Sequence, residues 1–362
     1  MTFSALSLLQ KLLIVILIVA GLYYAREFLM PLAIAGVLAT LFLPFCKRME
    51  KRKVPKVLAV LVCILVLLSA ITGIVWLLSW QVSQLASDFE TIKQKFTIML
   101  ERIQQYLFTH FGISAEKQSQ AIKDQQYSFS GIFQVIAGSA VSLLTNLILT
   151  FAYIFLLLYY RSHLRKFLLK LSPPSNRNEL SQVINDVVNV SQQYLTGLSK
   201  MIMCLWIMYG ISFSIIGVKN PLFFAFLCGV LEIIPFIGNI TGTTVTLLVT
   251  AVQGGSPAML LAIVGTYGLV QFIQGWVLEP LIVGPHVKIN PFSTIIALVL
   301  GEMLWGIPGI FLAIPLVAMF KIVCDHTESL KPYGYLIGEV VDGKGKINFA
   351  KKIKGWFKKR KS

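Results

Sequence analysis

The stretch LEIIPFIGN (residues 231–239) decides how this chain folds, because it sets a glutamate, a proline and a glycine inside a long apolar segment. As one straight helix, the apolar segment 221–252 would be about 48 Å long, against a hydrocarbon core of about 30 Å. It is therefore too long for one straight crossing, and Pro235, Gly238 and Asn239 interrupt it. We expect a helix that is broken at membrane depth.

A second apolar segment, 291–323, repeats this pattern and is interrupted at Gly306, Pro308 and Gly309. Each segment begins with a proline that follows an asparagine (Asn220 and Asn290), and each carries a glutamate twelve residues after that asparagine. So few residues match that an internal repeat and a chance resemblance both stay open. Paired apolar segments interrupted by Gly and Pro are typical of the binding site of a transporter.

The composition is that of an integral membrane protein. The 362 residues are 56% hydrophobic and 13% charged, with a mean hydropathy of +0.76, whereas a soluble domain carries about 25% charged residues. The net charge of +16 does not indicate a nucleic-acid partner, because the basic residues cluster in loops between apolar spans. Loops 47–56 and 161–170 are strongly basic, and the positive-inside rule therefore places them in the cytoplasm.

We expect an all-α polytopic protein of about eight transmembrane helices, two of them interrupted, plus an extracytoplasmic helical segment. We expect an amphipathic helix at 178–195 on the cytoplasmic side. A separate transmembrane span follows it at 201–218. The expected parts are N-terminal transmembrane helices at 1–80, the extracytoplasmic helical segment at 81–131, a transmembrane helix at 132–160, a cytoplasmic amphipathic segment at 161–200, a C-terminal transport core at 201–323 and a basic cytoplasmic tail at 324–362.

The extracytoplasmic segment carries a heptad stripe of apolar residues. Their spacing alternates between four and three residues and predicts a helix with one apolar face that packs against another helix. The stripe comprises Leu85, Phe89, Ile92, Phe96, Met99, Ile103 and Tyr106. It packs either on a neighbouring helix of the same chain or on another protomer, and the second alternative predicts a homo-oligomer.

Three glutamates stand in the apolar C-terminal third with no basic residue beside them in the sequence: Glu232, Glu279 and Glu302. An ionised carboxylate at bilayer depth costs about 2.5–3.5 kcal/mol. Protonation or a bound cation would lower that cost, which indicates a proton or cation pathway. Helix capping or contact with lipid headgroups is the alternative. For Glu279, the following proline disfavours a helical backbone.

Polar side chains near the breaks could line such a pathway. Threonines follow Asn239 closely and suit a small polyhydroxylated solute or a partly hydrated ion, unless they bond their own helix carbonyls. Gly238 and Gly242 form a G-x-x-x-G pair, which favours close helix packing over a gating hinge. The expected path comprises Glu232, Pro235, Gly238, Asn239, Thr243, Gln271, Gln274, Glu279, Glu302, Gly306 and Pro308.

The sequence lacks the motifs that are typical of ATP-driven transport, metal binding and hydrolysis. There is no Walker A or dinucleotide-binding glycine loop, so ATP-driven transport by this chain alone is not expected. The four histidines and five cysteines match no metal-ligand spacing, and no Ser-His-Asp grouping is present. We therefore expect no enzymatic activity, no cofactor and no metal site.

Three blocks of the chain resemble the autoinducer-2 exporter family of bacterial permeases. They are LEIIPFIGN, then VLEPLIVGPHVKINP (277–291), then GEMLWGIPGIFLAIP (301–315). The matching motif positions are Glu232, Pro235, Gly238, Pro280, Gly284, Gly306, Gly309 and Pro315. Asn239 departs from the family, in which a proline is expected after the glycine of the first block.

The resemblance implies about eight membrane helices in the bacterial inner membrane, both termini in the cytoplasm, and a homo-oligomer. Some members are assigned export of autoinducer-2 and others sodium/proton antiport. We therefore expect a secondary transporter or exporter of a small solute, coupled to H⁺ or Na⁺. The alternatives are a sodium/proton antiporter and a membrane scaffold that transports nothing.

Overall fold

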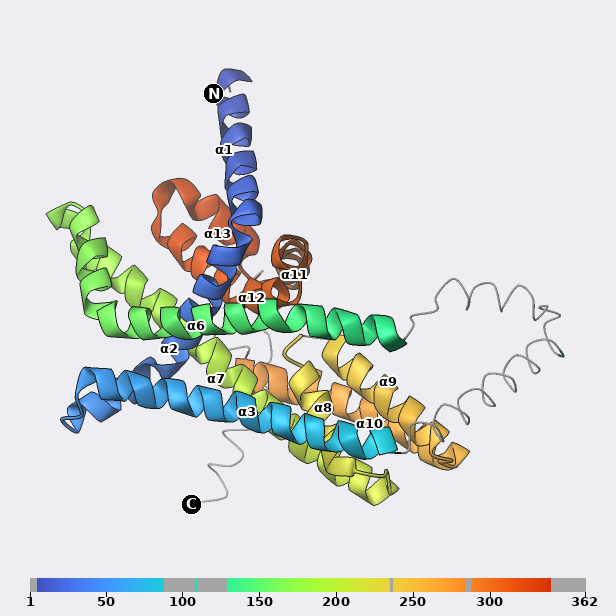
Figure 1. The fold of residues 1–362 in the computed structure, drawn as a ribbon. Helices are drawn as coiled ribbons and strands as arrows, with labels where there is room; N and C mark the ends of the chain where they lie inside the picture. Colours follow the sequence, from blue (N-terminus) through green and yellow to red (C-terminus); the bar gives the residue numbers. More distant parts are fainter. Residues whose placement is uncertain (1–4, 88–108, 110–128, 235–236, 284–287, 340–362) are drawn as a thin grey trace, which may run out of the picture. The chain divides into compact units, whose positions relative to one another are not determined.

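The computed structural model describes residues 5–87, 109, 129–234, 237–283 and 288–339, and these residues are almost entirely helical (Figure 1). The long helices share the apolar composition of membrane spans. The α-helices are α1 (Ala5–Tyr24), α2 (Arg26–Lys51), α3 (Lys56–Ser87), α6 (Phe129–Leu171), α7 (Arg177–Ile216), α8 (Pro221–Leu231), α9 (Ile237–Val252), α10 (Pro257–Ile273), α11 (Pro291–Trp305), α12 (Ile307–His326) and α13 (Lys331–Ile337). A π-helix, Gln274–Val283, continues α10.

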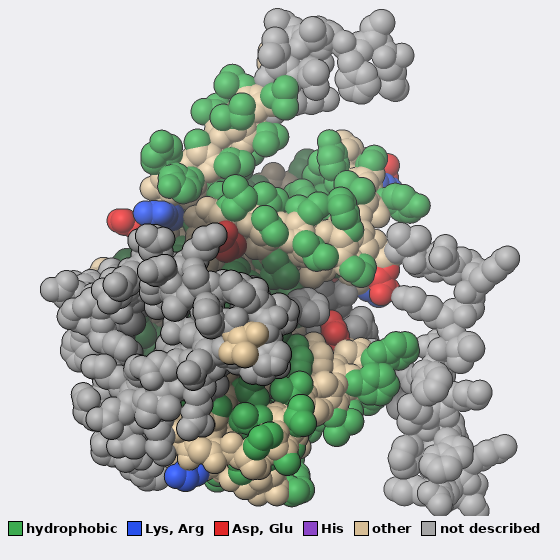
Figure 2. Space-filling view, turned by 90° about the vertical axis from the view of Figure 1, so that its right-hand side faces the viewer, with side chains coloured by type: hydrophobic (Ala, Val, Ile, Leu, Met, Phe, Trp, Pro, Cys, Tyr) green, Lys and Arg blue, Asp and Glu red, His purple; other side chains and the backbone are tan. Residues whose placement is uncertain are grey.

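Six helices of the described part are long and apolar enough to cross a membrane, and four shorter helices are also apolar. Hydrophobic side chains form broad patches on the described surface in the view of Figure 2, with few charged side chains among them. Large apolar residues such as Ile207, Leu261 and Trp276 are exposed. Such a surface requires lipid around it, which confirms the expected all-α polytopic membrane protein.

The chain divides into two compact units, each made of segments that are distant in the sequence. The first unit comprises Met1–Pro44, Leu157–Met201 and Gln271–Ser362, and the second comprises Phe45–Leu156 and Ile202–Val270. Residues 201–323, expected to form one transport core, therefore contribute to both units.

In the second unit, α8 and α9 form a helical hairpin and lie side by side (Figure 1). The two helices of the hairpin lie close together because α9 presents glycines to α8. A β-carbon at Gly238 would overlap the carbonyl of Leu231, and one at Gly242 would lie 2.8 Å from Cys228 Cα. The predicted break is confirmed between Leu231 and Ile237, but Gly238 and Asn239, which were expected to interrupt the helix, lie in the first turn of α9. The predicted close approach at the G-x-x-x-G pair is confirmed.

In the first unit, α11 and α12 form a second hairpin. Its bend is at Gly306, whose φ of 64° and ψ of −144° are accessible only to glycine without strain. Gly301 and Gly309 face each other across the hairpin, and neither could carry a β-carbon without overlapping the other's carbonyl region. The predicted interruption of 291–323 is therefore confirmed at Gly306, whereas Pro308 and Gly309 lie in the first turn of α12.

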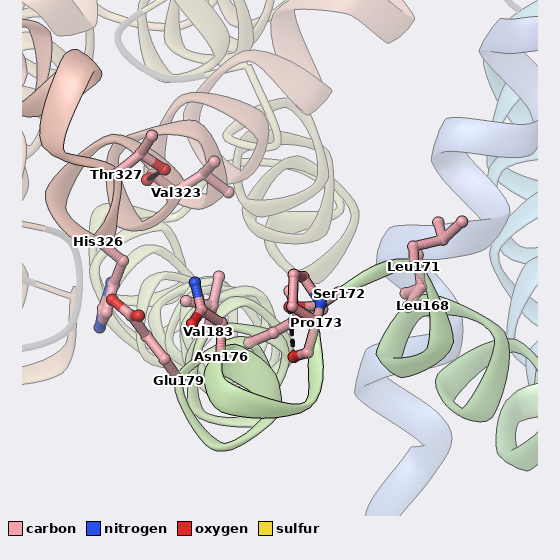
Figure 3. A pocket seen from close by; sticks show the side chains of 11 residues that line it. Leu168, Leu171, Ser172, Pro173, Asn176, Glu179, Val183, Val323, His326 and Thr327 are labelled. Carbon is pink, nitrogen blue, oxygen red and sulfur yellow. Dashed lines mark hydrogen bonds between the residues drawn. The ribbon is translucent and has the colours of Figure 1, made fainter.

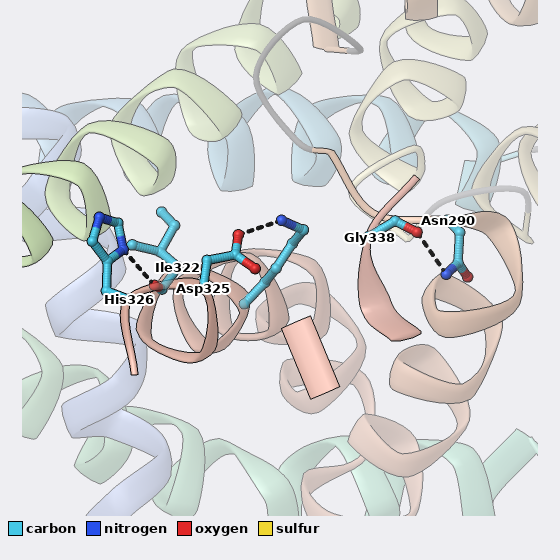
Figure 4. A network of polar contacts seen from close by, with 6 residues as sticks. Asn290, Ile322, Asp325, His326 and Gly338 are labelled. Atoms are coloured by element: carbon cyan, nitrogen blue, oxygen red, sulfur yellow. Dashed lines mark hydrogen bonds and ion pairs between the residues drawn. The ribbon is translucent and has the colours of Figure 1, made fainter. Parts of the chain in front are cut away.

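The start of α11 is fixed to the end of α13. Asn290 accepts a hydrogen bond from the Ser293 amide at 2.7 Å and donates from Nδ2 to the carbonyls of Leu336 (2.6 Å) and Gly338 (2.9 Å). Figure 4 shows the bond to Gly338. Ile289 and Gly338 also form an antiparallel bridge. Asn290 is thus both the N-cap of α11 and a clamp on the segment after α13.

Two expectations about helix boundaries are wrong. The amphipathic helix at 178–195 and the span at 201–218 are one continuous helix, α7, of 40 residues. The composition changes between them, but no proline ends the helix there, and Gly197 alone does not break it. Glu279 has a helical backbone despite the proline after it, because it lies in a π-helix, whose turns are wider than those of an α-helix.

The heptad stripe lies outside the described residues, apart from Leu85, whose backbone belongs to α3. Its packing on the same chain or on another protomer stays a prediction, and so does the homo-oligomer.

Candidate functional site

Glu232 lies at the break between α8 and α9 and is buried, with 2% of its surface exposed. The α8 helix ends there in a tightened turn. The amide of Glu232 donates to the Cys228 carbonyl at 3.2 Å, and the amide of Ile233 donates to the Val230 carbonyl at 3.1 Å. The Glu232 side chain that follows this turn is buried and lies near Cys228 and Tyr209 of the same unit.

One face of α9 continues the polar character of the site. Asn239, Thr243, Thr246 and Thr250 follow one another at helical spacing, and all are between 0% and 7% exposed. Thr246 donates to the carbonyl of Gly242 at 2.8 Å, as a threonine that satisfies its own helix does. Thr243 and Thr250 do not, since their buried hydroxyls have no hydrogen-bond partner among the described residues.

Tyr209 of α7 completes this group. Its side chain is fully buried, and within the part of the chain that the structure describes its hydroxyl also has no hydrogen-bond partner. The hydroxyl lies near Thr243, Cys228 and Glu232, although Thr243 stands outside hydrogen-bond geometry. Buried polar atoms nearly always have a partner, so several buried hydroxyls without one in the same region indicate a place for a ligand, an ion or water.

Trp206, one turn before Tyr209, holds α8 in place. Its Nε1 donates to the Phe226 carbonyl at 3.2 Å, and its ring stacks on the Phe226 ring with centroids 4.7 Å apart. The indole also fills the space above Gly229, where a β-carbon would overlap it. Because Gly229 is three residues before Glu232, this contact helps to set the position of the carboxylate.

The structure brings four of the expected path residues together in this region: Glu232, Gly238, Asn239 and Thr243. The remaining described ones belong to the first unit. There, Gln274 is buried with 6% exposed, Gln271 is half-buried, and Glu279 and Glu302 are exposed. Gly306 makes the bend of the second hairpin, and Pro308 is in the first turn of α12. Their part in a path stays a prediction.

Pro235 and Gly284, two positions of the family motif, lie outside the described residues. Sequence reasoning missed Tyr209 and Thr250. A lone tyrosine in an apolar span is a weak signal, although its place one helical turn after Trp206 puts both on the same side of α7. Thr250 continues the threonine series by one more turn, and that spacing could have identified it.

Comparison with known proteins gives the family. Residues 12–329 match the model of the AI-2E family transporters. The AI-2 transport protein TqsA of Escherichia coli (strain K12) is 21% identical over 351 residues, which cover 94% of this chain and 97% of TqsA. YrrI of Bacillus subtilis (strain 168) is 24% identical over 308 residues, covering 83% of this chain and 87% of YrrI. YueF of the same organism is 27% identical over 311 residues, covering 80% and 82%. The chain therefore belongs to the AI-2E family of transporters.

Proposed function

We propose that this protein is a secondary transporter that moves a small solute across the bacterial inner membrane, driven by H⁺ or Na⁺ bound at Glu232. The observation that carries the proposal is the burial of this carboxylate at the tip of the α8–α9 hairpin, where only 2% of it is exposed. A carboxylate kept at such a position is costly unless it takes up a proton or a cation.

The lengths of the helices support a site inside the bilayer. The 11 residues of α8 and the 16 residues of α9 correspond to about 16 Å and about 24 Å at the α-helical rise, less than the hydrocarbon thickness of about 30 Å. A hairpin with such short arms enters and leaves on one side of the membrane, and its tip with Glu232 then stands at membrane depth.

The side chains around Glu232 suit ligands that bind to oxygen atoms. A carboxylate, the Asn239 amide and the hydroxyls of Thr243 and Tyr209 offer oxygen atoms, which sodium and hydroxylated solutes both bind. Autoinducer-2, which the name of TqsA assigns to that relative, is a candidate solute of the second kind.

A sodium/proton antiporter is a second candidate, in which the cation is itself the cargo. The same buried carboxylate favours it, because a single acid that binds either H⁺ or Na⁺ exchanges the two ions without a further solute. A membrane scaffold that transports nothing is a third reading. It would use the helical segment 81–131 and the first half of α7 as docking surfaces.

Topology and assembly belong to the same proposal. The basic residues at the C-terminal ends of α2 and α6 favour cytoplasmic termini, with the segment 81–131 outside. A homo-oligomer is part of the proposal, with the heptad stripe of that segment packed on another protomer; packing on the same chain is the alternative. Export is the direction that the family name suggests.

Reconstitution tests the proposed function. The purified chain in liposomes receives a proton gradient, a sodium gradient or a membrane potential, one at a time, and the probes are autoinducer-2 and a pH dye in the lumen. Autoinducer-2 flux that follows one gradient supports the coupled transporter. Luminal pH changes that follow sodium without any solute support the antiporter. Neither signal, from protein that is folded and inserted, refutes both and leaves the scaffold.

A further inference from the structure

A crevice runs between the first half of α7 and the second half of α12, within the first unit and outside the candidate site. One section, of about 470 Å³, has Glu179, Val183 and His326 in its lining (Figure 3). The next section, of about 380 Å³, also includes His326, so the two sections meet at that side chain. Both volumes are in the range of small-molecule sites.

The section of about 380 Å³ is lined largely by polar and charged side chains. One wall is the α7 face with Asp186, Asn189 and Gln193, spaced so that they share one side of the helix. Lys321, Asp325 and His326 of α12 form the opposite wall, and Lys288 comes from the segment before α11.

The charged groups of α12 already have partners. Lys321 and Asp325 form an ion pair at 2.5 Å, and His326 Nδ1 is 2.9 Å from the Ile322 carbonyl, as Figure 4 shows. Asp186 and Lys288 differ from them. Within the described part of the chain, neither makes a hydrogen bond or an ion pair, with each other or with any other residue.

We infer that this section of the crevice binds a small zwitterion that carries one ammonium group and one carboxylate. Asp186 receives the ammonium group, and Lys288 receives the carboxylate. The amides of Asn189 and Gln193 can donate to and accept from the remaining polar atoms of the ligand. The inference does not depend on the proposed transport function.

The arrangement of charges favours a zwitterion over an ion of one sign. An anion at Lys288 would lie in a cavity that also holds Asp186 and Asp325, and a cation at Asp186 would share it with two lysines. A zwitterion satisfies both unpartnered groups at once without adding net charge. Each charge-assisted contact contributes enough that its loss weakens binding at least about tenfold.

Thermal unfolding of the purified full-length chain in detergent tests the inference. The probes are glycine, β-alanine, 4-aminobutyrate and 6-aminohexanoate, which separate the two charges by increasing distances. Butyrate and butylamine are the matched controls, because each keeps the carbon chain of 4-aminobutyrate and only one of its charges. A ligand that binds the folded state raises the melting temperature in proportion to the logarithm of its concentration.

We expect one chain length to raise the melting temperature more than the others, and both controls to raise it much less. Asp186→Asn and Lys288→Gln should each weaken this effect at least about tenfold in concentration. The exchanged pair, Asp186→Lys with Lys288→Asp, should restore it, because the ligand can bind reversed. Glu179→Gln, in the neighbouring section, should leave it unchanged.

The inference is overturned if no zwitterion stabilises the chain at about 100 mM, a concentration well above the Kd of a weak metabolite site. Equal stabilisation by butyrate or butylamine also overturns it, as does an unchanged response in both single variants. If Asp186→Asn fails to fold, Lys288→Gln decides alone, since Lys288 is exposed.

Discussion

Because α8 and α9 lie so close together, the stability that Gly242→Ala would lose can be predicted. The added β-carbon would lie 2.8 Å from Cys228 Cα and 2.9 Å from its Sγ, whereas carbon atoms in contact stand about 3.5–4.0 Å apart. The helices must therefore separate by about 1 Å, and overpacking of this kind costs about 1–3 kcal/mol.

Alanine also favours a helix over glycine by about 1 kcal/mol, which would hide part of that cost. Gly265→Ala in α10 is the matched control, because it brings the same gain in helix propensity and no atom lies within 4 Å of its β-carbon position. The difference between the two variants isolates the packing cost.

Thermal unfolding in detergent, followed by size-exclusion chromatography, gives the comparison. At about 2.1 cal/mol/K of unfolding entropy per residue, a chain of 362 residues shifts its melting temperature by about 1.3 °C for each kcal/mol, so Gly242→Ala should melt about 1–4 °C below Gly265→Ala. Equal melting temperatures would refute the close hairpin and, with it, the position assigned to Glu232.

Three further predictions concern the hairpin and its neighbours. In a cysteine-free background, new cysteines at Lys219 and Ser256 should react with a membrane-impermeant reagent from the same side, because α8 and α9 turn back; labelling from opposite sides would mean that they span together. Trp206→Phe keeps the stack on Phe226 but loses the indole donor, and should lower stability by about 0.5–1.5 kcal/mol in a detergent melt; unchanged stability would remove Trp206 as the anchor of α8. Asn290→Ala loses the α11 cap and the bonds to the segment after α13, and should cost about 1–2 kcal/mol in the same assay; a neutral result would show that water replaces this clamp.

Local chemistry made the breaks in the helices predictable. Proline and glycine cannot continue a regular helix without cost, so the interruptions before Ile237 and at Gly306 could be located from residue types alone. The continuity of α7 was not predictable in this way, because a change of composition resembles a boundary whether or not the backbone bends.

The candidate site was predictable where a residue is unusual in its surroundings. Glu232 stands out in an apolar run, and Gly238 and Gly242 have a recognised spacing. Tyr209 does not stand out, because only tertiary packing places its hydroxyl near Thr243 and Glu232. The crevice between α7 and α12 was missed for the same reason, since Asp186 and Lys288 are about a hundred residues apart in the sequence.

The most direct test of the account is to measure gradient-driven flux of Glu232→Gln in liposomes, with Glu179→Gln as the matched control. Both variants remove one carboxylate and keep its shape, but Glu232 is buried and Glu179 is exposed and outside the expected path. We expect Glu232→Gln to insert and fold normally yet to lose all flux driven by proton or sodium gradients, while Glu179→Gln keeps most of it. Wild-type coupling in Glu232→Gln would contradict the account and leave the glutamate as a helix cap.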